Sequence, residues 1–155
     1  MNNLTINKTL EGPTKSYRYA AILALVIGAG AYCIGLFNAD MLLNEKGYYL
    51  ITLLYGLFSV VSLQKTIRDK AEGLATSKIY GSLSWASSGL AIGLLIIGLI
   101  NADLLLSEKG FFGMAYTLSL FASVTVQKNV RDTQATKTIA VGPVELEDTD
   151  QPIQN

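Results

Sequence analysis

The hydrophobic residues of this chain gather in four charge-free blocks, and not in the alternating pattern of a half-buried helix or strand. Two blocks of 19 and 22 residues cover 19–37 and 79–100. A 19-residue helix is about 28 Å long, which matches a bilayer hydrocarbon core of about 30 Å. Each long block is followed by one of 16 residues, at 48–63 and 111–126. The pattern predicts an all-α integral membrane protein with four transmembrane helices.

The two short blocks leave two interpretations open. Sixteen residues form only about 24 Å of helix, which is marginal for a span. The blocks are either re-entrant or interfacial, or their helices begin a turn earlier. We favour the earlier start, because Asn44 and Ser107 are good N-cap residues. Glu45 and Glu108 would then lie in the first turn, where the helix dipole favours an anion.

An internal repeat is the strongest feature of the sequence. Residues 35–70 align without gaps on residues 98–133, with 17 identities in 36 positions. Both segments carry Asn-Ala-Asp, Leu-Leu, Glu-Lys-Gly, Leu-Phe and Gln-Lys-x-x-Arg-Asp in the same order. Duplication of a two-helix unit explains this order. Because each unit contributes two spans, both copies face the same way, and the sequence predicts two tandem parallel helical hairpins.

The repeat divides the chain into five segments. They are a flexible N-terminal arm (1–16), a first two-helix repeat (17–70), a cytoplasmic connection (71–78), a second two-helix repeat (79–133) and a C-terminal tail (134–155). The tail is acidic and contains two prolines, and we expect it to be disordered.

The basic residues are distributed unevenly, and their distribution predicts the topology. Ten of the 12 Lys and Arg residues lie before residue 19, between 64 and 78, or after 127. The two hairpin loops hold only Lys46 and Lys109. The positive-inside rule places the side with the ten in the cytoplasm. We therefore expect a multi-pass protein with its N- and C-termini cytoplasmic.

Composition argues against several kinds of chemistry. The net charge is zero, so nothing drives nucleic-acid binding across the whole chain. The chain has no His, which excludes imidazole metal sites and His-dependent triads, and its single Cys33 lies inside an apolar block. The predicted spans contain no buried carboxylate or Lys. We expect no enzyme, no catalytic residue, no cofactor and no metal ion.

The polar residues around each loop form a repeated group that we call the hairpin motif. A structural interpretation has Asn ending one helix in the left-handed conformation, Glu capping the next and Lys reaching the headgroups. A functional interpretation has Asp40 and Asp103 binding a cation or a proton. We favour the structural interpretation, with an interaction role open. The motif residues are Asn38, Asp40, Glu45, Lys46, Gly47, Asn101, Asp103, Glu108, Lys109 and Gly110.

A second repeated group follows the short blocks, where we expect the helices to continue past the membrane. Lys65 and Asp69 are four residues apart and would face each other on a helix. Basic side chains here would hold anionic headgroups and enforce the topology. These interface anchors are Gln64, Lys65, Arg68, Asp69, Gln127, Lys128, Arg131 and Asp132.

Small residues recur in the first helix of each unit. Ala24-xxx-Gly28 and Ala31-xxx-Gly35 are small-xxx-small pairs, and Gly89-xxx-Gly93 is a GxxxG step. Such residues let helix backbones approach closely in lipid. They indicate either packing among the four helices or a homo-oligomer interface, and one sequence leaves both open.

With its doubled NAD-x-LL-x-EKG…LF…QK-x-x-RD pattern, the segment 17–133 resembles the bacterial YiaA/YiaB inner membrane protein family. The resemblance implies two copies of that family's two-helix domain and a small multi-pass protein of the Gram-negative inner membrane. It implies no established activity and brings no catalytic residue to this chain.

Two hypotheses for function follow. The first is a non-enzymatic protein that acts by interaction with membrane lipid, with itself or with an unknown membrane protein, and not with nucleic acid. The alternative is a small-solute or ion pathway formed by a homo-oligomer. It is motivated by the repeated acids Asp40 and Asp103 at one membrane face.

Overall fold

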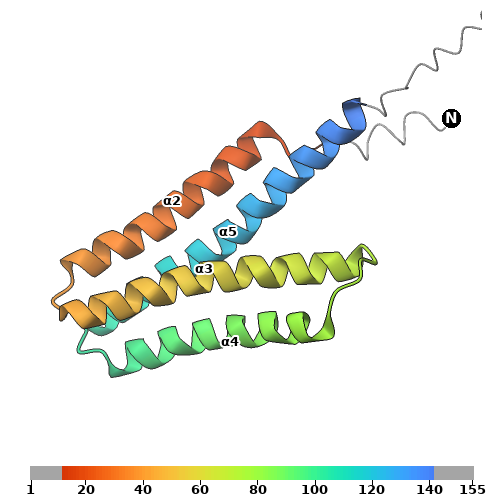
Figure 1. The fold of residues 1–155 in the computed structure, drawn as a ribbon. Helices are drawn as coiled ribbons and strands as arrows, with labels where there is room; N and C mark the ends of the chain where they lie inside the picture. Colours follow the sequence, from red (N-terminus) through yellow and green to blue (C-terminus); the bar gives the residue numbers. More distant parts are fainter. Residues whose placement is uncertain (1–11, 142–155) are drawn as a thin grey trace, which may run out of the picture.

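A computed structural model describes residues 12–141 of the chain, and side chains as far as residue 136. This part forms four α-helices joined by short connections (Figure 1) and contains no strand. The all-α prediction is therefore confirmed. The helices are α2 (Lys15–Asn38), α3 (Leu43–Ala71), α4 (Lys78–Asn101) and α5 (Leu106–Val141).

The helices extend beyond the apolar blocks at both ends. α3 and α5 begin at Leu43 and Leu106, so Asn44 and Ser107 lie inside the first turn and the prediction that they are N-caps is wrong. Glu45 and Glu108 do lie in the first turn. The N-cap position of α3 is Leu42, and the Glu45 carboxylate accepts a hydrogen bond from its backbone N–H. A long acidic side chain thus replaces the short polar cap that we expected.

The chain ends differ from the predicted segments. α2 begins at Lys15, inside the predicted arm 1–16, and residues 1–11 lie outside the described residues. α5 continues to Val141, several residues into the segment 134–155 that we expected to be disordered. The remainder of that segment, 142–155, lies outside the described residues.

Three of the four helices, α2, α3 and α4, are long and apolar enough to cross a membrane. Within the described residues α5 does not meet the same standard. The expectation of four helices is confirmed, whereas length and composition identify three candidate spans.

Each helix packs chiefly against the opposite hairpin. α2 lies along α5, α3 lies along α4, and α3 and α5 meet at the centre (Figure 1). Contacts between α2 and α3, or between α4 and α5, are few by comparison. The repeat maps α2 onto α4 and α3 onto α5, so the α2–α5 interface is the counterpart of the α4–α3 interface. The hairpins therefore interlock, with α3 and α5 in contact at the centre.

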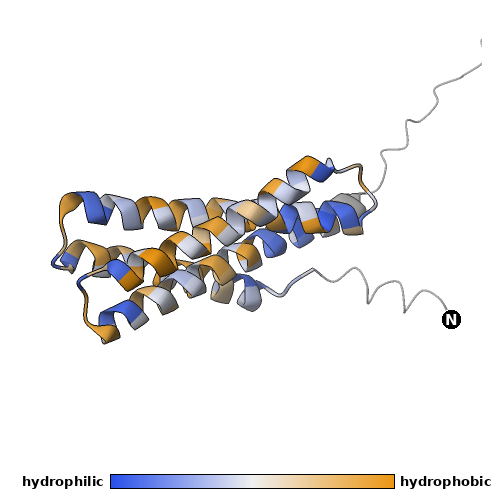
Figure 2. Cartoon of the chain, turned by 90° about the horizontal axis from the view of Figure 1, so that it is seen from below, coloured by the Kyte–Doolittle hydropathy of each residue, from blue (hydrophilic) through white to orange (hydrophobic). Residues whose placement is uncertain are grey.

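The core is aromatic, and all four helices contribute to it. The ring of Tyr32 meets that of Phe112 edge-on, with centroids 5.3 Å apart, and its hydroxyl donates to the backbone oxygen of Tyr49 over 3.1 Å. Large apolar side chains also cover the outside, with Ile51 and Phe58 more than two-thirds exposed. Figure 2 shows hydrophobic residues along the helices and in the hairpin turns, with hydrophilic residues gathered toward the helix ends. This distribution is typical of a protein whose solvent is lipid.

Candidate functional site

The hairpin motif begins with an asparagine whose side chain donates a hydrogen bond to the backbone of its own helix. The Nδ2 of Asn38 donates to the oxygen of Ile34 over 2.8 Å, and Asn101 donates to Ile97 over 2.7 Å. The chain then leaves each helix through an extended alanine, and no described non-glycine residue has a positive φ. The predicted left-handed exit is therefore wrong. The asparagine side chain instead bonds back to the carbonyl four residues earlier, in the last turn of its own helix.

Glutamate and lysine complete the motif in the same way in both copies. Glu45 accepts from the backbone N–H of Leu42 and Glu108 from that of Leu105, each over 2.8 Å. The ammonium groups of Lys46 and Lys109 donate to the last carbonyls of the preceding helices, those of Phe37 (3.0 Å) and Ile100 (3.3 Å). These lysines therefore close the hairpins, and the prediction that they reach for headgroups is wrong. The acid and the base each complement a helix dipole.

A cavity of about 240 Å³ lies between the start of α3 and the end of α4. Its lining includes Asp40 and Glu45 from the first repeat and Asp103 from the second, together with Tyr48 and Tyr49. The fold therefore brings the predicted acids of both copies to one place. Within the described residues, no group of three or more Asp, Glu or Cys side chains has an arrangement that could hold a metal ion.

The other hairpin has a matching cavity of about 280 Å³ between α2 and α5, with different chemistry. Phe111 and Phe112 stand where the first cavity has Tyr48 and Tyr49, and no aspartate is among the lining residues. The two repeats are thus equivalent in backbone but not in chemistry. The cavity between α3 and α4 is the more polar one, and we take it as the candidate site.

Glycines in the first helix of each repeat allow close contact with the opposite hairpin. A Cβ atom added to Gly28 would lie 2.9 Å from Oγ of Ser119, and one added to Gly35 would lie 2.6 Å from the Phe111 ring. A Cβ added to Gly89 or Gly93 would meet nothing within 4 Å. Packing within the chain therefore explains Gly28 and Gly35 of α2, but not the GxxxG step of α4.

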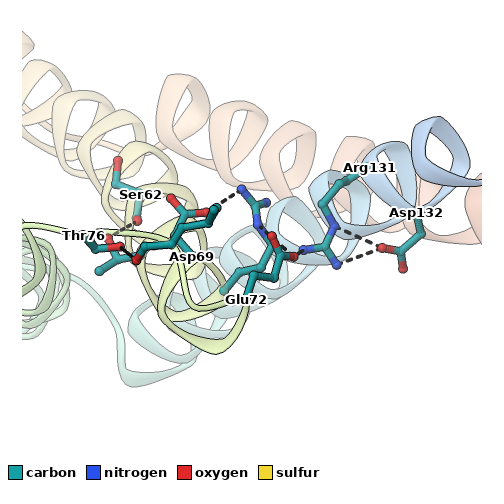
Figure 3. A network of polar contacts seen from close by, with 9 residues as sticks. Ser62, Asp69, Glu72, Thr76, Arg131 and Asp132 are labelled. Atoms are coloured by element: carbon teal, nitrogen blue, oxygen red, sulfur yellow. Dashed lines mark hydrogen bonds and ion pairs between the residues drawn. The ribbon is translucent and has the colours of Figure 1, made fainter. Parts of the chain in front are cut away.

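The interface anchors lie at the end of the bundle opposite the hairpins. Arg68 pairs with Asp69 over 2.9 Å and Arg131 with Asp132 over 2.8 Å. Glu72 lies within 3.7 Å of Arg68 and 3.5 Å of Arg131, so it links the two repeats (Figure 3). Asp69 thus pairs with its neighbour Arg68, and the predicted pairing with Lys65 is wrong.

The remaining anchors have varied surroundings. Lys65 and Lys128 are exposed, whereas Gln64 and Gln127 are half-buried. The Oε1 atom of Gln127 is buried without a hydrogen-bond partner among the described residues. The buried Thr66–Ser84 contact of 3.2 Å joins α3 and α4. The tyrosines of the candidate site were not predicted. The replacement of Tyr48-Tyr49 by Phe111-Phe112 within the repeat is the signal that could have identified the tyrosines.

Comparison with known proteins places this architecture among bacterial membrane proteins. The chain is 56% identical over 110 residues to Inner membrane protein YiaA of Escherichia coli (strain K12), covering 71% of this chain and 76% of that one. It is 29% identical over 111 residues to Inner membrane protein YiaB of the same organism, covering 71% and 94%. It is 38% identical over 60 residues to the Uncharacterized membrane protein YubF of Bacillus subtilis (strain 168), covering 38% and 69%. No solved structure matches.

The family model described as the yiaA/B two helix domain matches the chain twice, at residues 17–69 and 80–132. The two matches coincide with the two interlocked hairpins, α2–α3 and α4–α5. The chain therefore belongs to the yiaA/B two helix domain family and carries two tandem copies of the domain.

Proposed function

We propose that this chain is a multi-pass protein of the bacterial inner membrane that acts by interaction and not by catalysis. We also propose that the chain crosses the membrane four times and has both termini in the cytoplasm. Its relatives YiaA and YiaB are named inner membrane proteins, and three of its helices are apolar enough to cross a bilayer. The distribution of basic residues supports the orientation.

The packing of α5 supports its role as the fourth span. α5 lies along α2 and buries Phe112 and Tyr116 in the shared core. Its serines and threonines donate to carbonyls of their own helix, as Ser119 does to Ala115 over 2.7 Å and Thr125 to Phe121 over 2.9 Å. Polar side chains satisfied in this way are tolerated in lipid.

Reporter fusions test the topology. A reporter that is active only outside the cytoplasm is fused, in three separate fusion proteins, after residues 73, 104 and 155. A reporter that is active only inside is fused at the same sites. We expect the inside reporter to work at 73 and 155 and the outside reporter at 104. An outside signal at 155 with an inside signal at 73 would rule out α5 as a span.

The exposed side chains beside the hairpin turns are the observation that supports the interaction role. In both copies the asparagine, glutamate and lysine bond to backbone groups of the hairpin. These residues are therefore occupied in shaping the turn. Beside them Leu43 and Leu106 are each 86% exposed, and Asp40 and Asp103 are exposed as well. Exposed leucines next to acids form a surface suited to a partner.

Site-specific photocrosslinking in native membranes tests this role. A crosslinking amino acid is placed at Leu43 or Leu106, and at Phe58 as a control on the outer surface of α3. We expect discrete protein adducts from the two hairpin positions and lipid adducts from position 58. Adducts to lipid alone at all three positions would contradict a protein partner at this surface.

The alternative is a solute or ion pathway, which the cavity lined by Asp40 and Asp103 favours. Four helices with a filled core leave little room for a pore, so the pathway would need a homo-oligomer. Flux into vesicles containing the purified protein tests it, with Asp40→Asn/Asp103→Asn as the variant. Flux that is abolished by the variant would favour the pathway, and an absence of flux in the parent protein would exclude it for the solute tested.

A further inference from the structure

The start of α2 carries two basic side chains around a small cavity. Lys15, Arg18, Tyr19 and Ile22 line a space of about 170 Å³. Within the side chains described, residues 12–136, no carboxylate forms an ion pair with Lys15 or Arg18. The cavity therefore has two positive charges that the described part of the bundle does not neutralise.

The other two arginines of the chain differ in this respect. Arg68 pairs with Asp69 and Glu72, and Arg131 pairs with Asp132 and Glu72 (Figure 3). Their guanidinium groups already have carboxylate partners. The sequence predicts that the basic interface anchors, these two arginines among them, hold anionic headgroups. Their guanidinium groups are paired with carboxylates, whereas Arg18 has no carboxylate partner among the side chains that the structure describes.

The other two of the four residues that line the cavity are mainly apolar. Tyr19 and Ile22 follow the two basic residues along the helix and are 72% and 45% exposed. They lie at the start of the charge-free block, where an interfacial tyrosine is typical of a membrane protein. The site is thus positively charged at one end and apolar at the other, along the direction in which α2 would enter the bilayer.

We propose that this cavity binds an anionic phospholipid of the cytoplasmic leaflet. Lys15 and Arg18 would donate hydrogen bonds to phosphate oxygens, and Tyr19 and Ile22 would contact the upper part of an acyl chain. The choice of leaflet rests on the proposed function, in which α2 enters the membrane from the cytoplasm.

The second repeat supplies a natural comparison. Its counterpart of Arg18 is Gly81, and the cavity at the start of α4 has Lys78 as its one charged lining residue. The lipid site therefore belongs to the first repeat. The site lies at a position where the sequences of the two repeats differ, outside the shared hairpin motif.

Native mass spectrometry of the full-length protein in detergent tests the site, with phosphatidylglycerol as the probe and phosphatidylcholine as the zwitterionic control. Lys15→Gln/Arg18→Gln is the test variant. Lys70→Gln/Lys78→Gln removes the same charge from exposed positions on α3 and α4, and Lys78→Gln alone tests the second repeat. The single variants Lys15→Gln and Arg18→Gln separate the two contributions, and circular dichroism checks that each variant is folded.

We expect the parent protein and both control variants to retain phosphatidylglycerol in preference to phosphatidylcholine. The double variant should bind it roughly tenfold less, or weaker still. Equal retention by all variants, or no preference for the anionic lipid, would overturn the site. Because binding in detergent does not depend on orientation, a reporter fusion that contradicts the topology would change the leaflet but not the lipid result.

Discussion

Tyr48 of α3 lies directly against Gly98 of α4. A Cβ atom at position 98 would stand 2.7 Å from Cε1 of the tyrosine, and the tyrosine hydroxyl donates a 2.6 Å hydrogen bond to the backbone oxygen of Leu94. The repeat has the same relationship between Gly35 and Phe111, without the hydroxyl. One glycine in each repeat thus leaves room for an aromatic ring from the opposite hairpin to pack against the helix backbone.

The first prediction concerns this contact. Gly98→Ala should destabilise the protein by about 1–3 kcal/mol, because the methyl group would overlap the Tyr48 ring and displace its hydrogen bond. Thermal unfolding in detergent measures the change. Gly93→Ala, five residues earlier on α4, is the matched control, since a Cβ there meets nothing within 4 Å. Equal effects of the two substitutions would show that the ring contact does not matter.

The second prediction concerns the hairpin cap. Glu45→Ala should cost about 1 kcal/mol of unfolding free energy, because the N–H of Leu42 loses its acceptor at 2.8 Å. Glu45→Gln should retain most of that stability, since the amide oxygen can accept the same hydrogen bond. Chemical unfolding in mixed micelles provides the measurement. A glutamine variant as unstable as the alanine variant would point to charge, and not the hydrogen bond, as the source of the effect.

The third prediction concerns the buried hydroxyl of Tyr32. Tyr32→Phe removes the hydrogen bond to the backbone oxygen of Tyr49 and leaves the ring contact with Phe112 in place. We expect a loss of about 1 kcal/mol, visible as a lower unfolding temperature. Tyr17→Phe is the control, because Tyr17 is 52% exposed and no hydrogen bond of its hydroxyl is found among the described residues. An unchanged unfolding temperature for Tyr32→Phe would be evidence against this hydrogen bond.

The fourth prediction concerns the interlocked hairpins. The connection between α3 and α4 can be cut after Leu74, next to Gly73, whose φ is 72°. Because each helix packs chiefly on the other hairpin, fragments 1–74 and 75–155 expressed together should associate and co-purify.

Each fragment expressed alone should be degraded or should pair with a second copy of itself. Pulse-chase labelling and affinity purification of a tagged fragment distinguish these results. Two fragments that are each stable as monomers would refute the interlocked arrangement.

The hairpin motif shows which structural features the sequence predicts and which it does not. Its residues were recognised from the repeat, and the first-turn position of Glu45 was predicted correctly. The bonding was not predicted, because Asn38, Asn44 and Lys46 can each satisfy a helix end in several ways. The choice depends on backbone angles that only the folded hairpin fixes. Similarly, spacing placed Lys65 opposite Asp69, whereas the bundle directs Asp69 to Arg68.

The sequence by itself determined the helices and their duplication. Uncharged stretches of about 20 residues satisfy their backbone groups in lipid only as helices, and two copies of one unit must resemble each other in structure. Only the tertiary structure decided that α2 pairs with α5 and α3 with α4, that Asp40 and Asp103 share one cavity, and that Arg18 lacks a described acidic partner while Arg68 and Arg131 have theirs. The physical reason is that helix formation depends on residues close together in the chain. The pairing of helices depends on contacts between residues far apart in the chain, such as Gly98 with Tyr48, which the pattern along a single helix does not encode.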